Sequence, residues 1–138
     1  MGDRTNVGIK TSNGNTIFIY LHWGGMDRHE IVAKAISEAM LRENDESYFT
    51  RIFVSRVIDT DWDKETGVGM AINELPSSGD GYDVPVYDYT NKTISIHQED
   101  WTDGAGGLAH YISEVYDRDE YLAKYAIRGV GAYVTMES

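Results

Sequence analysis

The residues best suited to bind a ligand stand where a predicted strand meets a predicted helix. Two histidines, a tryptophan, two glycines and an arginine fall within one short stretch: His22, Trp23, Gly24, Gly25, Arg28 and His29. Glycines let backbone N–H groups approach a ligand closely, and a helix N-terminus carries about half a positive charge. The imidazoles and the guanidinium add donors for an anion, and the indole offers a platform for a planar base. We interpret the stretch as a site for an anionic, nucleotide-like small molecule.

A purely structural interpretation of the same stretch stays open. The Gly24–Gly25 pair can serve only as a tight turn, and Trp23 can be a core anchor. Asp27, at the start of the predicted helix, can occupy the free N–H groups itself and repel a phosphate. The pattern is also much weaker than a full glycine-rich phosphate loop.

The acidic run Asp59–Gly67 is the second candidate for chemistry. Asp59, Asp61 and Asp63 imitate the first three ligand positions of a calcium loop. The imitation ends there, because Lys64 stands where the loop needs glycine and Met70 where it needs a bidentate glutamate. We therefore predict a solvated acidic loop and no metal site.

Residues for catalysis are sparse. The histidines lack the i, i+4 spacing of a helical zinc site, and no G-x-S-x-G motif occurs. One base-and-orienter pair can be drawn, in which His22 meets Asp88 or Asp83 across the sheet. The sequence favours a binding protein over an enzyme and indicates no cofactor.

The elements that position these residues begin with a hairpin. Val7–Thr11 and Thr16–Trp23 are rich in strand formers and are joined across an Asn-Gly turn. A D-x-x-E capping pattern then precedes apolar residues at helical spacing, which predicts a helix over Arg28–Glu43. A second apolar stripe predicts a helix over 48–58.

The rest of the chain reads as short strands and a helical tail. Strands are predicted over Val68–Asn73, Val84–Tyr89 and Thr93–His97, helices over Ala109–Ile127, and a final edge strand over Ala132–Met136. We predict one α+β domain over residues 1–138. Its expected form is an antiparallel β-sheet packed against a helical hairpin, with a C-terminal helical segment.

Composition limits the class of protein. The chain has 138 residues, no cysteine and a net charge of −11. The absence of cysteine excludes disulfides and thiolate metal sites and favours a cytoplasmic location. No segment approaches the roughly 20 apolar residues of a membrane span, and the acidic charge disfavours direct binding to nucleic acid. A basic protein partner fits the charge.

Tyrosines gather late in the chain, at Tyr82, Tyr87, Tyr89, Tyr111 and Tyr116. Tyrosine is enriched at protein interfaces, although sheets favour it as well. We predict a homo-oligomer.

Four stretches resemble a group of small uncharacterised proteins of bacteriophages and bacterial genomes. They are GDRTNVGIK near the start, YLHWGG, YFTRIFVSRVI and DKETGVGMAI. The resemblance covers roughly residues 2–98, so that 98–138 stands as a C-terminal extension. It implies a phage or prophage origin and the host cytoplasm, and it implies no chemistry.

Two functions fit these observations. In the first, the protein sequesters a nucleotide-derived immune signal and so inhibits host anti-phage defence without catalysis. In the second, it is an acidic protein inhibitor or nucleic-acid mimic that occupies a basic groove of a host defence enzyme.

Overall fold

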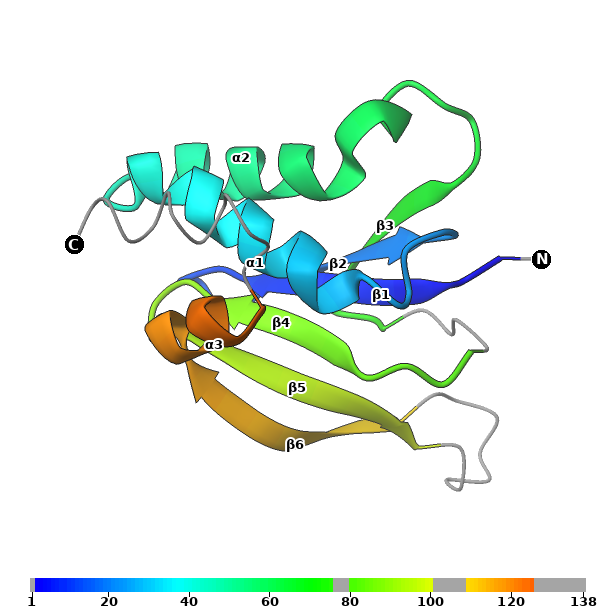
Figure 1. Cartoon of the computed structure of the whole chain (residues 1–138). Helices are drawn as coiled ribbons and strands as arrows, with labels where there is room; N and C mark the ends of the chain where they lie inside the picture. Colours follow the sequence, from blue (N-terminus) through cyan, green and yellow to red (C-terminus); the bar gives the residue numbers. More distant parts are fainter. Residues whose placement is uncertain (1, 76–79, 101–108, 126–138) are drawn as a thin grey trace.

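The computed structural model describes residues 2–75, 80–100 and 109–125, and these residues form an α+β structure (Figure 1). Its elements, in chain order, are β1 (Thr5–Lys10), β2 (Thr16–Leu21), α1 (Arg28–Ala39), the 3-10 segment η1 (Met40–Arg42), α2 (Glu46–Ile58), η2 (Asp59–Asp61), β3 (Val68–Ile72), β4 (Val84–Asp88), β5 (Thr93–Asp100), β6 (Ala109–Asp117) and α3 (Arg118–Tyr125). No described helix combines the length and apolar character that a membrane span requires.

The strands form one sheet in the order β3-β2-β1-β4-β5-β6. The prediction of an antiparallel sheet is wrong at its centre, because β1 and β4 pair in parallel, with Gly8 opposite Val86. Hairpin turns set the direction of the neighbouring strands β1 and β2. The chain reaches β4 only after two helices and β3, so no turn fixes its direction beside β1. The sheet is therefore mixed.

The three helices pack on one face of the sheet and share one core with it. Figure 1 shows α1 and α2 side by side over the strands, and α3 packs against α1 and against β5 and β6. Ile9 and Ile19 enter this core from the N-terminal hairpin, and Tyr87 enters it from β4. The Tyr87 ring stacks on Phe49 of α2, with ring centroids 5.4 Å apart.

The N-terminal hairpin and the two long helices are present as predicted, with shifted ends. Val7 pairs with Ile19 in the hairpin, and Gly14 in its turn has a φ of 91°, a conformation that glycine adopts freely. The first helix ends at Ala39 and continues as η1, so it stops short of the predicted Glu43. Asp27 makes no side-chain capping bond, contrary to the capping pattern.

The prediction of helices throughout Ala109–Ile127 is wrong over its first half. Residues 109–117 form β6, and the helix begins only at Arg118. Isoleucine, valine and tyrosine favour strands, and β5 offers a paired edge that no local pattern in the sequence reveals. The strand predicted over Ala132–Met136 lies outside the described residues.

The described residues 109–125, which lie beyond residue 98, are integral to the fold. β6 pairs with β5 along its length, with Ile94 opposite Tyr116. Tyr121 and Leu122 of α3 are 0% and 2% exposed in the shared core. On the opposite face of the sheet a smaller cluster joins Phe18, Leu75, Val84 and Val86.

Candidate functional site

The strand-to-helix joint is closed by the chain's own N-terminal arm. Gly24 turns the backbone with a φ of 117°. The N–H of Gly25 donates to the carbonyl oxygen of Asp3 at 2.8 Å, and the N–H of Met26 donates to the Asp3 carboxylate at 2.9 Å. Tyr82 donates to the same carboxylate at 2.6 Å, and this bond, ahead of that from Met26, lowers the pKa of Asp3. Asp3 thus takes the place that a ligand anion would need.

Arg28 is committed to internal partners as well. Its Nη2 lies 2.6 Å from the Asp83 carboxylate, its Nη1 donates to the carbonyl of Gly25 at 2.7 Å, and its guanidinium lies over the Tyr82 ring. Burial by itself raises the pKa of Asp83, but the hydrogen bonds from His29 and Arg28 and the Arg28 charge outweigh it, so the pKa is lowered. The ion pair leaves Arg28 no spare charge for a phosphate.

His29 is buried between Asp83 and the last helix. Its Nε2 lies 3.0 Å from the Asp83 carboxylate and its Nδ1 lies 2.9 Å from the Tyr121 hydroxyl. Its ring stacks on Tyr125 with centroids 4.4 Å apart. Burial raises the pKa of Tyr121, which keeps the hydroxyl neutral. Both ring nitrogens are occupied, so His29 has none left for a substrate.

The histidine that contacts Asp83 is His29. His22 instead lies 3.1 Å, through Nδ1, from the Tyr20 hydroxyl. The carboxylate of Asp88 accepts from Asn91 in the β4–β5 turn. The signal for this cluster in the sequence is the adjacent pair Arg28 and His29 at a helix start. Their contact with Asp83 depends on the tertiary structure.

The Trp23 side chain is exposed, unlike those of Arg28 and His29. It is 60% exposed, which overturns its alternative interpretation as a core anchor. Its ring meets the edge of the His22 ring at a centroid distance of 5.0 Å. A large aromatic side chain this exposed next to a recess is a typical contact for a ligand or partner.

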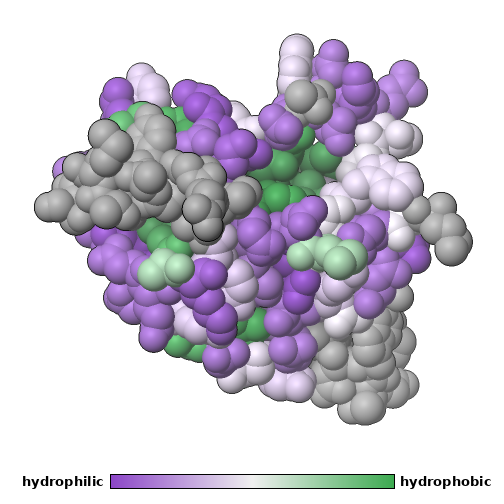
Figure 2. Space-filling view, viewed as in Figure 1, coloured by the Kyte–Doolittle hydropathy of each residue, from purple (hydrophilic) through white to green (hydrophobic). Residues whose placement is uncertain are grey.

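That recess, here called the Trp23 groove, has a volume of about 220 Å³. Figure 2 shows an apolar hollow between polar rims, in the region where Figure 1 places α1 and the end of α2. The groove is lined by Leu21, Trp23, Ile31, Lys34, Arg56, Val57, Ile58, Asp59, Asp61, Gly67 and Val68. Five of these side chains are aliphatic, and they come from β2, α1, α2 and β3.

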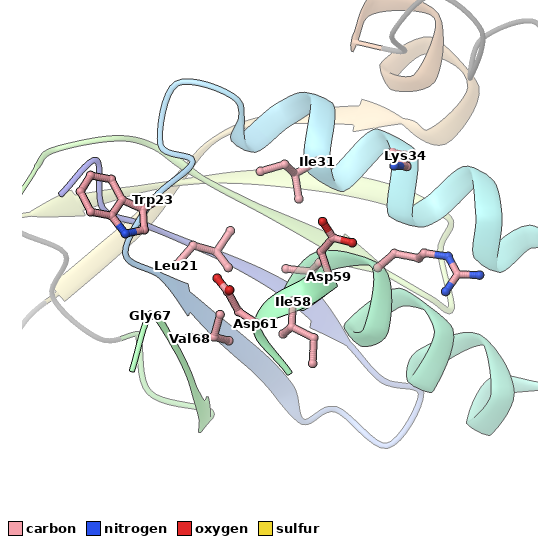
Figure 3. A pocket seen from close by; sticks show the side chains of 11 residues that line it. Leu21, Trp23, Ile31, Lys34, Ile58, Asp59, Asp61, Gly67 and Val68 are labelled. Carbon is pink, nitrogen blue, oxygen red and sulfur yellow. The ribbon is translucent and has the colours of Figure 1, made fainter. Parts of the chain in front are cut away.

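Charged residues surround this apolar floor (Figure 3). Arg56 is paired with Glu38. Within the described part of the chain Lys34 has no hydrogen bond or ion pair, and neither carboxylate, Asp59 nor Asp61, has a side-chain partner. In Figure 3 the Asp59 carboxylate points toward Ile31 and Lys34, while that of Asp61 points toward Leu21.

Asp59 also has an unusual backbone. Its φ is 50° and its ψ is −121°, at the point where α2 ends. A side chain other than glycine adopts this region at a cost of about 1–3 kcal/mol, and such residues gather at functional sites. Sequence reasoning treated the run from Asp59 only as a failed calcium loop and missed its position at this groove.

The described residues hold no group of three or more His, Cys, Asp or Glu side chains able to bind one metal ion. Asp63, the third member of the calcium-like series, lies 3.9 Å from the Lys64 ammonium. Among the late tyrosines, Tyr87 is buried and Tyr111 is exposed, while the others are partly buried. As a group they line the interior more than a surface.

Comparison with protein-family models, curated proteins and solved structures finds no match for this chain. The Trp23 groove is therefore the feature from which we infer a function.

Proposed function

We propose that the protein binds a small planar molecule in the Trp23 groove and acts by holding it, without catalysis. The observation that carries the proposal is the 60% exposed indole of Trp23 at an apolar recess. Water solvates such a surface poorly, and a ring laid on the indole removes apolar area from water on both partners.

The size of the recess favours a compact ligand. Pockets for drug-sized molecules measure roughly 300–1,000 Å³, and the Trp23 groove measures about 220 Å³. We infer that one ring system enters it and that any further groups of the ligand extend into solvent. A nucleoside or mononucleotide fits this description better than a dinucleotide.

The charged residues of the groove favour a ligand that carries both hydrogen-bond donors and an anionic group. The unpaired carboxylates of Asp59 and Asp61 accept hydrogen bonds from an exocyclic amine, as acidic side chains do from cytosine. The unpaired ammonium of Lys34 attracts a phosphate. Trp23 lies at one end of the groove and Lys34 toward the other (Figure 3), so a base and its phosphate can reach both at once. The ligand class that follows is an aminated heterocycle that carries a phosphate.

The joint residues support this site indirectly. Gly25, Arg28 and His29 fix the turn that carries Trp23 and Gly24, because Asp3, Asp83 and Tyr121 bind them. The direct ligand contacts are therefore assigned to Trp23, Lys34, Asp59 and Asp61, and the groove lies where a proposed helical hairpin of α1 and α2 meets the sheet.

The biological setting comes from the resemblance described above. We propose that a phage-encoded chain of this kind sequesters a nucleotide-derived immune signal in the host cytoplasm and thereby inhibits anti-phage defence, as a homo-oligomer. Sequestration of this kind requires only that the groove hold its ligand, without turnover.

Calorimetry with adenosine, AMP and ADP-ribose tests the binding site. Trp23→Ala should weaken binding by about 1–3 kcal/mol, the value of one stacked base. Trp62→Ala is the matched control, since Trp62 is 73% exposed and does not line the groove. Lys34→Ala should weaken the binding of AMP and leave the binding of adenosine unchanged.

Both tryptophan variants should keep the unfolding midpoint of the wild type, because both side chains are exposed. Equal binding by the Trp23→Ala and Trp62→Ala proteins would overturn the site. Failure of all three compounds to bind would overturn the nucleotide class and leave the acidic inhibitor of a basic host protein as the better explanation.

A further inference from the structure

Among the described residues, the outer edge of β6 is an unpaired strand edge. β6 is the last strand of the sheet, and no described residue pairs with its outer side (Figure 1). Natural edge strands are blunted by short length, proline, charged side chains (lysine above all) or β-bulges. Ala109–Asp117 runs for 9 residues without lysine or proline, and its blunting features are the acids Glu114 and Asp117 and one bulge. Such an edge can template pairing with another strand.

Apolar side chains accompany this edge. Tyr111, Ile112 and Val115 are 57%, 55% and 57% exposed. Three large exposed apolar residues on one strand are more than the scattered exposure normal for a surface. They mark β6 as an interaction surface.

A β-bulge places two of these residues on the same face. Residues three apart on a regular strand point to opposite faces. The register shift beside Ile96 and His97 leaves no β5 residue directly opposite Ser113 in the ladder, so that Ile112 pairs with His97 while Val115 pairs with Ser95. His97 and Ser95 are two apart on β5, which puts Ile112 and Val115 side by side on the face away from the helices.

The sequence of β6 is complementary to itself in one antiparallel register. With a two-fold axis between Ser113 and Glu114, Ile112 falls opposite Val115 of a second copy on one face. Tyr111 falls opposite Tyr116 on the other face. The bulge makes this register consistent, since without it Ile112 and Val115 would point to opposite sides.

The charged residues of β6 are compatible with the same register. Glu114 falls opposite Ser113, so the two copies of Glu114 do not face each other directly. Apolar cross-strand pairs contribute to sheet pairing, whereas like charges directly opposite destabilise it. We propose that the protein forms a two-fold homodimer in which β6 pairs with β6 of a second copy and the sheet continues through both.

Sedimentation equilibrium tests the dimer. The wild-type chain should sediment as a dimer at micromolar concentration. The double variant Ile112→Asp/Val115→Asp sets acid opposite acid twice and should sediment as a monomer. The matched control Met70→Asp/Ile72→Asp changes two residues that are each 55% exposed on the other edge strand, β3, and should remain a dimer.

A charge-swapped mixture separates loss of the interface from loss of the fold. Ile112→Lys/Val115→Lys should also be monomeric alone, and its equimolar mixture with the aspartate variant should sediment as a heterodimer. A monomeric wild type, or a dimeric aspartate variant, would overturn the proposal. A mixture that stays monomeric would overturn the β6 register.

Disulfide trapping tests the register directly. The chain contains no cysteine, so only the introduced cysteines can form a cross-link. A mixture of Ile112→Cys and Val115→Cys chains should cross-link under mild oxidation, whereas each variant alone should cross-link far less. A mixture of Ile112→Cys and Met70→Cys is the control. Equal cross-linking in both mixtures would overturn the β6 pairing.

Discussion

His29 on α1 and Asp83, 54 residues later, are joined by a 3.0 Å contact between Nε2 and Oδ1. The same carboxylate binds Arg28, and His29 continues the contact to Tyr121 on α3. One acidic side chain therefore ties the start of α1 to the segment before β4 and, through the imidazole, to the C-terminal helix. His29, which the sequence suggests as a ligand-binding residue, instead links the start of α1 to Asp83 and to α3.

Replacement of Asp83 tests this role. Asp83→Asn leaves the partly buried Arg28 guanidinium without its counter-charge, and we expect a loss of about 2–4 kcal/mol in the free energy of unfolding. Urea denaturation measures it. The control Asp63→Asn changes a carboxylate that is 54% exposed and paired only with its neighbour Lys64, and it should stay within about 0.5 kcal/mol of wild type. Equal midpoints for both variants would contradict the role.

The Asp83 contribution should depend on pH. Its pKa in the folded protein lies below the ordinary value of 3.8, so the unfolded chain takes up the proton first as the pH falls. The stabilisation is therefore present above pH about 5 and is lost as the pH falls through the folded pKa. The difference in unfolding free energy between wild type and Asp83→Asn, measured by urea titration at several pH values, should shrink in acid. A constant difference would assign the effect to another group.

Gly25 should not tolerate a methyl group. A Cβ there would lie 2.3 Å from Cε2 of Tyr82 and 2.8 Å from the Asp3 carboxylate. Gly25→Ala must displace the Tyr82–Asp3 pair and should cost about 1–3 kcal/mol. Gly69→Ala is the control, because its Cβ would have only an ordinary contact at 3.9 Å from Tyr20. Thermal denaturation that finds Gly25→Ala as stable as Gly69→Ala would show that the N-terminal arm does not pack against the joint.

Leu122 should behave as a core residue despite its position in the C-terminal extension. It is 2% exposed, so Leu122→Ala should destabilise the protein by about 2–5 kcal/mol. Leu41→Ala makes the same chemical change at a side chain that is 66% exposed, and the expected loss there is within about 0.5 kcal/mol. Similar chemical denaturation curves for the two variants would argue that α3 does not pack on α1.

The sequence by itself determined the elements whose signals are local. An Asn-Gly turn between two strand-forming runs specifies the N-terminal hairpin, because the turn brings the two strands together without help from the rest of the chain. Apolar residues at helical spacing specify α1 and α2 in the same way. The exposed acidic loop and the short strands β3, β4 and β5 also follow from turn residues and strand formers in their own segments.

Only the tertiary structure decided what these elements meet. The pairing of β1 with β4, the strand character of residues 109–117 and the contact of His29 with Asp83 join residues that are far apart in the chain. Local propensity carries no information about such partners, since pairing and burial compensate for a weak local signal. For the same reason, the candidate site lies at the Trp23 groove and not at the strand-to-helix joint. The positive charge of Arg28 was visible in the sequence, but its neutralisation by Asp83, and the groove that Trp23 shares with Lys34 and Asp61, exist only after the chain has folded.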